Sequence, residues 1–207
     1  EDNNHNLFKG TDSLWLWRVG FLTDDQDTAF QSFGYTDYRL RRWNNHEQGF
    51  EGHSWWIRAH DRKDEWGTWG LRVPSSPLGY SGRYAIQAYI PKHPSGIQWT
   101  TEANYKIFYK SADGSKNFQI EATLDQEAGQ DNWRTLKYKT NNLSPIELEL
   151  QPDSIVLVTL AEKTGDLLKN PNSAVVFDAI RLHGIKAQSS ELSSINLKWL
   201  DNGIGQD

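Results

Sequence analysis

Residues 83–90 read RYAIQAYI, and the alternation in this stretch predicts the fold class of the chain. Every second position is apolar or aromatic, namely Tyr84, Ile86, Ala88 and Ile90. The positions between them include the polar residues Arg83 and Gln87. Successive side chains of a β-strand point to opposite faces, so the stretch is typical of a half-buried antiparallel strand.

The same pattern recurs along the second half of the chain. Three further alternating runs are ANYKIFY at 103–109, NFQIEATL at 117–124 and IELEL at 146–150. The runs at 154–160 and 174–182 are more continuously apolar, as central strands are. Ala112–Ser115 forms a short turn signal between two runs and predicts a hairpin. Strands at this spacing without long helices predict an all-β fold, an antiparallel β-sandwich or jelly roll.

The composition limits the function classes. A chain of 207 residues usually forms one domain, and the absence of cysteine excludes disulfides, thiolate zinc sites and cysteine nucleophiles. The absence of methionine predicts a piece excised from a longer chain. A net charge of −5 argues against nucleic acid or an anionic membrane as partner. The chain has no run of about 18 apolar residues, so no membrane-spanning helix is predicted.

The ten tryptophans raise the main functional question, and four of them lie in SWWIRAHDRKDEWGTW at 54–69. Neighbouring strand positions face opposite ways, so Trp55 and Trp56 split between faces, as do Trp66 and Trp69. Exposed tryptophans would stack on sugar rings, whereas buried ones would only fill the core. The predicted ligand-binding residues are Trp56, Trp66, Trp69 and Tyr80, with His60 and Asp61 as hydrogen-bonding partners.

No pattern indicates an enzyme or a metal centre. The phosphate-binding glycine patterns GxGxxG and GxxxxGK[ST] are absent, and HDRKDE at 60–65 is most simply a polar turn between two strands. No catalytic residue, metal site or cofactor is therefore predicted, although Asp24, Asp25 and Asp27 could contribute to a structural calcium site. Asp178 falls among apolar residues, where a structural carboxylate bonded to a loop is favoured over a catalytic acid.

An ordered series of motifs points to a family. GLRVP at 70–74 and GRYAIQAYIP at 82–91 are followed by ANYKIFY, the pair Asp125–Gln126, NWRTL at 132–136 and VVFDAIRL at 175–182. The chain resembles the golvesin C-terminal-like domains over about residues 50–185. Lys137 departs from the family pattern, which has glycine there, and residues 1–45 match nothing in it.

The resemblance implies a galactose-binding-like jelly roll, similar to carbohydrate-binding domains of secreted bacterial enzymes, and favours an extracellular or cell-surface location. We expect a golvesin-like domain at 49–185, an N-terminal extension at 1–48 packed on it, and a tail or linker at 186–207. Trp133 and Asp178 are expected to be structural. The predicted function is a non-catalytic accessory module that binds polysaccharide or glycan. The alternative is a domain that docks on a neighbouring domain or partner protein, through aromatic anchors.

Overall fold

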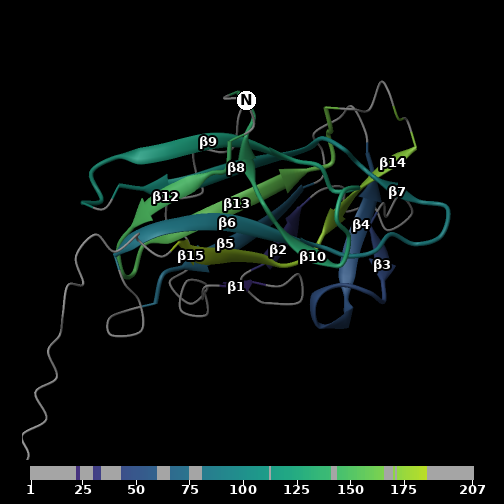
Figure 1. The fold of residues 1–207 in the computed structure, drawn as a ribbon, viewed down its shortest axis with the longest axis horizontal. Helices are drawn as coiled ribbons and strands as arrows, with labels where there is room; N and C mark the ends of the chain where they lie inside the picture. Colours follow the sequence, from purple (N-terminus) through teal and green to yellow (C-terminus); the bar gives the residue numbers. More distant parts are fainter. Residues whose placement is uncertain are drawn as a thin grey trace, which may run out of the picture.

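The computed structural model describes residues 22–23, 30–33, 43–59, 66–74, 81–111, 113–140, 144–165, 170 and 172–185. These residues form three β-sheets with one short 3-10 turn, η3 (Phe50–Gly52), and no α-helix occurs among them (Figure 1). No helix in this part of the chain has the length and apolarity to cross a membrane. The predicted all-β sandwich is confirmed.

The two larger sheets form the layers of the sandwich. The six-stranded sheet runs in the order β11 (Lys137–Tyr138), β9 (Asn117–Leu124), β8 (Ala103–Lys110), β13 (Ile155–Ala161), β5 (Trp66–Arg72) and β2 (Phe30–Phe33). The five-stranded sheet runs in the order β1 (Leu22–Thr23), β15 (Ile180–Ile185), β6 (Gly82–Ile90) and β10 (Asn132–Thr135), with β12 (Glu147–Leu150) also paired to β6.

A four-stranded sheet lies at the right of Figure 1. Its order is β3 (Asn44–His46), β4 (Ser54–Arg58), β14 (Ser173–Phe177) and β7 (Gln98–Trp99). The pairing of β7 with β14 is parallel, and the other pairings of the described strands are antiparallel.

The alternating runs form strands as predicted. The runs at 83–90, 103–109, 117–124 and 146–150 correspond to β6, β8, β9 and β12. The predicted hairpin joins β8 and β9, whose antiparallel register ends with Lys110 opposite Asn117. The apolar run at 154–160 is β13, and it is central because β8 and β5 pair with its two edges.

The run at 174–182 is not a single strand, which corrects the sequence-based expectation. It divides into β14 and β15, which belong to different sheets and are separated by Asp178 and Ala179. Strands that pass from one sheet to another do so through a bend, and a bend interrupts the alternation of side chains. The alternation of side chains therefore does not continue through Asp178, and Val176 and Phe177 are both buried although they are adjacent.

Among the described residues before residue 49, three strands pair with later strands of the chain. β1 pairs with β15, β2 with β5, and β3 with β4. Most of the predicted N-terminal extension at 1–48 lies outside the described residues, which include Trp43, whose ring centroid is 4.6 Å from that of Phe177. The tail at 186–207 also lies outside them, and the proposed domain boundaries remain a prediction.

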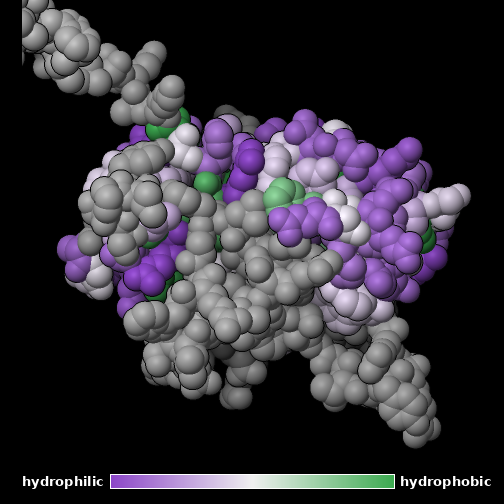
Figure 2. Space-filling model, turned by 90° about the horizontal axis from the view of Figure 1, so that it is seen from below, coloured by the Kyte–Doolittle hydropathy of each residue, from purple (hydrophilic) through white to green (hydrophobic). Residues whose placement is uncertain are grey.

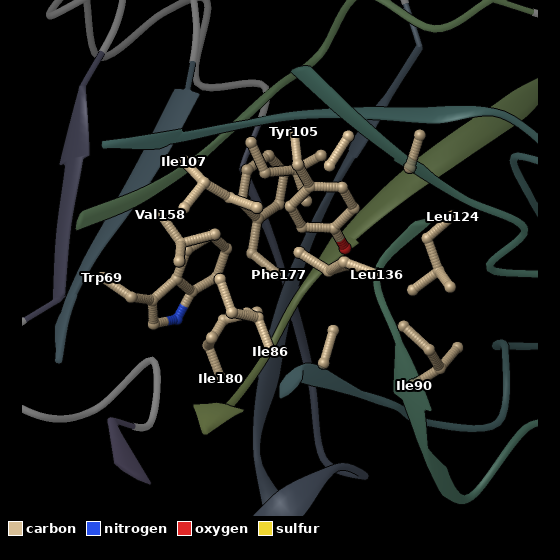
Figure 3. Close-up of a cluster of buried hydrophobic side chains, with 14 of the residues drawn as sticks. Trp69, Ile86, Ile90, Tyr105, Ile107, Leu124, Leu136, Val158, Phe177 and Ile180 are labelled. Carbon is tan, nitrogen blue, oxygen red and sulfur yellow. The ribbon is translucent and has the colours of Figure 1, made fainter. Parts of the chain in front are cut away.

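Large aromatic side chains fill much of the core. Trp69, Tyr84, Trp99, Tyr105 and Phe177 are among its largest fully buried side chains. Figure 3 shows the Trp69 indole beside residues of both large sheets, which are Ile86, Val158 and Ile180. The core therefore accounts for part of the tryptophan content, because an indole buries a large apolar area at one position.

A buried amide connects the six-stranded sheet to the four-stranded sheet. The Gln126 side-chain nitrogen donates to the Tyr105 hydroxyl and to the Val176 carbonyl, both at 3.0 Å. The Val176 N–H donates back to the Gln126 side-chain oxygen at 3.1 Å. Burial raises the pKa of Tyr105, so its hydroxyl stays neutral and hydrogen-bonded. The glutamine of the Asp125–Gln126 motif thus fills a buried site that needs both a donor and an acceptor.

Candidate functional site

The tryptophans predicted to bind ligand do not share one surface. Trp56 lies on β4 of the four-stranded sheet and is half-buried, with its ring centroid 6.5 Å from that of buried Trp99. Trp66 lies on β5 of the six-stranded sheet and is also half-buried. Since β4 and β5 belong to different sheets, the two side chains do not form a platform on neighbouring strands.

Trp69 is a core residue, which corrects its predicted role in ligand binding. Its side chain is 1% exposed, and its ring stacks on Phe177 with centroids 6.0 Å apart. Its indole N–H donates to the buried Asp178 carbonyl at 2.6 Å. The odd spacing of Trp66 and Trp69 does place them differently, one half-buried and one buried. Tyr80, His60 and Asp61 lie outside the described residues, as do Asp24, Asp25 and Asp27.

A different aromatic group lies on the outward face of the five-stranded sheet. Phe50, Tyr89 and Trp133 are half-buried, and each ring contacts the other two. Their centroids are 5.4 to 5.8 Å apart with interplanar angles of 62–73°. This edge-to-face geometry is favourable for aromatic pairs, so the three rings form a fixed cluster.

The alternation of β6 explains why these residues face outward. The even-numbered side chains Tyr84 to Ile90 are buried, which leaves Gln87 and Tyr89 on the opposite face. The register of β10 places Trp133 beside Tyr89 and Thr135 beside Gln87. The register of β15 places Arg181 on the other side of Gln87. We call Phe50, Gln87, Tyr89, Trp133, Thr135 and Arg181 the β6–β10 surface.

Phe50 reaches this surface from a loop that Asp178 holds in place. The Phe50 N–H donates to both carboxylate oxygens of Asp178, at 3.1 and 3.2 Å, and the Ala179 N–H donates to one of them at 2.7 Å. Gly49, with φ of 145°, leaves room for this contact, since a Cβ there would lie 2.7 Å from an Asp178 oxygen. Asp178 therefore connects the loop before β4 to the bend between β14 and β15.

Arg181 lies across the sheet face. Its Nε donates to the Gln87 side-chain oxygen at 2.8 Å, and its guanidinium carbon is 4.1 Å from the Trp133 ring centroid. The Gln87 amide nitrogen in turn donates to the Thr135 hydroxyl at 3.3 Å. A guanidinium stacked on an indole and bonded at Nε has little freedom, so this cation is held in position.

The Tyr89 hydroxyl stays protonated at neutral pH. Partial burial raises its pKa, and the negative charges of Asp131 and Asp178 raise it further. The pKa of Arg181 is lowered by partial burial, but a guanidinium remains charged in proteins. The β6–β10 surface thus offers a hydroxyl, an amide, a cation and aromatic carbon within one face.

The sequence contained a signal for this surface that the predictions did not use. Tyr89 falls on the polar face of RYAIQAYI, beside Arg83 and Gln87, where an aromatic residue is unexpected. Trp133 and Arg181 come from strands far away in the sequence, so only the strand registers bring them to Tyr89. The prediction followed the density of tryptophans along the chain, and that density reflects the core as well as the surface.

The described part of one face of the molecule is largely hydrophilic. Figure 2 shows mostly purple on the described part of one face, with small green areas. Phe118, at 39%, is the exposed large hydrophobic side chain in the described part of the chain. Within that part, no group of three or more His, Cys, Asp and Glu residues could hold a metal ion. The β6–β10 surface combines aromatic and polar groups on one face of the described structure.

Comparison with known proteins supports the fold. No family model matches the chain, and no curated protein matches it. The xanthan lyase from Paenibacillus aligns with a TM-score of 0.51 and 12% identity, over 79% of this chain and 13% of that chain. A family 35 carbohydrate-binding module from Clostridium thermocellum aligns with a TM-score of 0.41 and 11% identity, over 79% of this chain and 98% of the module.

A third solved structure contains the CBM22-1 and GH10 modules of xylanase 10B from Clostridium thermocellum with xylohexaose. It aligns with a TM-score of 0.40 and 11% identity, over 79% of this chain and 27% of that chain. This chain spans about an eighth of the xanthan lyase, so the likeness concerns one β-sandwich part of that enzyme. At 12% identity, the likeness to xanthan lyase establishes the fold alone.

Proposed function

We propose that this chain is a non-catalytic carbohydrate-binding module whose ligand lies on the β6–β10 surface. The observation that carries the proposal is the cluster of Phe50, Tyr89 and Trp133 beside a fixed guanidinium on one sheet face. We further propose that it belongs to a larger bacterial protein located outside the cell or at its surface, as the resemblance to golvesin C-terminal-like domains implies.

The chemistry of the surface fits a sugar ring. A pyranose has an apolar face of C–H groups and a rim of hydroxyl groups. Aromatic rings such as those of Tyr89 and Phe50 attract the apolar face by dispersion, whereas Gln87, Thr135 and the Tyr89 hydroxyl can bond the rim. Because the surface is assembled from three paired strands and the loop that Asp178 holds, its side chains are already placed before a ligand arrives, which lowers the entropy cost of binding.

Three acids of the described residues, Asp178, Glu147 and Asp153, also fit a structural role better than a catalytic one. Asp178 is committed to the backbone N–H groups of Phe50 and Ala179 and is 3% exposed. Glu147 pairs with Arg83, and Asp153 pairs with Arg72. A glycosidase needs two carboxyl groups facing the same sugar bond, and these acids are engaged with separate partners instead.

We expect Trp133→Ala to weaken polysaccharide binding by roughly 30-fold, since truncating a central aromatic anchor typically costs about 2 kcal/mol or more. The substitution removes an aromatic contact and also releases Arg181, Tyr89 and Phe50 from the ring they pack against. Affinity electrophoresis against a panel of insoluble and soluble polysaccharides measures the effect, and thermal unfolding checks that the variant is folded.

Trp66→Ala is the matched control because it makes the same chemical change at a half-buried tryptophan of the other large sheet. It should leave binding within about twofold of the unmodified protein. Loss of binding in Trp66→Ala with retention in Trp133→Ala would move the site to the tryptophans first predicted. If the unmodified protein retains no polysaccharide of the panel but binds a protein partner through this surface, the docking alternative holds instead.

A further inference from the structure

Arg181 differs from two other arginines of the described residues in how its guanidinium is used. Arg72 forms an ion pair with Asp153 at 2.5 Å, and Arg83 forms one with Glu147. Arg181 instead donates its Nε–H to the neutral Gln87 amide, and the flat face of its guanidinium lies over the Trp133 ring. Within the described part of the chain, its two terminal amino groups have neither a hydrogen bond nor a carboxylate partner.

The position of this unpaired cation is set by its neighbours. Gln87 is held by Thr135, and Trp133 is held by Phe50 and Tyr89, so the two groups that fix Arg181 are themselves fixed. With Nε and one face occupied, the edge formed by Nη1 and Nη2 is the part of the guanidinium left to bind a ligand. Partial burial has already removed some of its water, which strengthens its attraction to an anion.

We propose that the sugar ligand of the β6–β10 surface carries a carboxylate, as in a uronic acid, and that the Arg181 Nη groups bind it. This inference rests on the proposed function and names its ligand class. A uronic acid carries its carboxylate outside the ring, so the ring can contact Phe50 and Tyr89 while the carboxylate reaches the guanidinium. Charge-assisted hydrogen bonds from arginine to carboxylate are short, directional and stronger than neutral ones.

The net charge of the chain and the two acids near this surface do not favour the binding of an anion. The chain has a net charge of −5, so its overall field repels a polyanion and any preference for one must arise locally. The Asp178 carboxylate is already bonded to backbone N–H groups. Asp131 is exposed, and its charge acts on Tyr89, so it should oppose a bound carboxylate.

The test compares each acidic polymer with its own carboxyl-reduced form, which keeps the sugar backbone and removes the charge. Polygalacturonate, alginate and xanthan serve as probes, with dextran sulfate as an anion that lacks carboxylate. We expect the protein to bind at least one native polymer at least roughly tenfold more tightly than its reduced form, because hydrogen bonds to charged groups are among the strongest polar contacts. Arg181→Gln should abolish this preference, so that the native polymer and its reduced form bind with equal affinity to the variant.

Three variants separate a binding role from a packing role. Arg181→Lys keeps the positive charge but loses the planar pair of Nη donors. It should therefore retain only part of the preference that Arg181→Gln abolishes. Asp131→Asn removes a negative charge and keeps the Oδ1 that accepts the Lys92 N–H, so uronate affinity should rise a few-fold. Arg83→Gln, on the same strand face but already paired with Glu147, should leave the preference unchanged.

The outcomes distinguish this inference from the proposed function. Equal binding of native and reduced polymers, lost in Trp133→Ala, would overturn the uronate proposal and keep the carbohydrate site. A preference that survives Arg181→Gln, or binding of dextran sulfate without binding of any uronate polymer, would also overturn it. Failure to bind any native or reduced polymer would contradict both.

Discussion

Trp69→Ala is expected to lower the free energy of unfolding by about 3–5 kcal/mol, the usual range for removing a fully buried tryptophan. The indole is 1% exposed, stacks on Phe177 and lies between residues of the two large sheets (Figure 3). The substitution leaves a cavity there, and it removes the donor that satisfies the Asp178 carbonyl. Both effects act on the centre of the sandwich.

Urea unfolding followed by circular dichroism measures this change, provided that the transition remains two-state. Trp69→Phe separates the two contributions, because it retains most of the ring volume and loses the N–H; we expect a loss of about 1–2 kcal/mol. Trp66→Ala, at a half-buried position of the same strand, should destabilise the protein less than Trp69→Ala. Equal losses for the two tryptophans would contradict the assignment of Trp69 to the core.

Asp178→Ala should lower the free energy of unfolding by about 2–4 kcal/mol and also weaken polysaccharide binding. The carboxylate is 3% exposed and accepts the N–H groups of Phe50 and Ala179, so its removal leaves two donors without their acceptor. The loop that carries Phe50 then loses its link to the bend between β14 and β15. Binding should weaken because Phe50 is one of the three rings on the β6–β10 surface.

The two effects require two measurements, urea unfolding for stability and affinity electrophoresis for binding. Asp178→Asn keeps one acceptor oxygen and should lose less of both. Phe50→Ala is the control for the binding effect, since it removes the ring without touching the carboxylate. Binding that is reduced in Phe50→Ala but unchanged in Asp178→Ala would show that Asp178 does not position the loop.

The sequence predicts the strands of this fold well because apolar and polar residues alternate along a half-buried strand. β6, β8 and β12 alternate in burial over much of their length, since one face meets the core and the other is more exposed, whereas β9 is mostly exposed up to Glu121 and buried from Ala122 onward. No such sequence pattern marks the bend at Asp178. The apolar run continues through it, because Phe177 and Ala179 are both buried on either side of the sheet change. Periodicity reports which residues are buried and not which sheet buries them.

The candidate site was less predictable for a related reason. Alternation predicts that Trp66 and Trp69 face opposite sides of the strand but does not reveal which of them faces inward. In the structure Trp69 is the buried one. The β6–β10 surface joins Tyr89, Trp133 and Arg181 from three strands, and their adjacency depends on registers set by long-range pairing. An aromatic residue on the polar face of a strand, such as Tyr89, was the local signal for it.

The indole N–H signals of the tryptophans test most directly whether carbohydrate binds at the β6–β10 surface. In a nitrogen-15 NMR titration with xylohexaose, cellohexaose and hexagalacturonate in turn, at least one sugar should shift the Trp133 signal in a saturable manner. The Trp69 and Trp99 signals should not move, because their N–H groups are bonded to the buried carbonyls of Asp178 and Pro91. Shifts at Trp56 or Trp66 with Trp133 unchanged, or no shift with any of the three sugars, would contradict the proposed site.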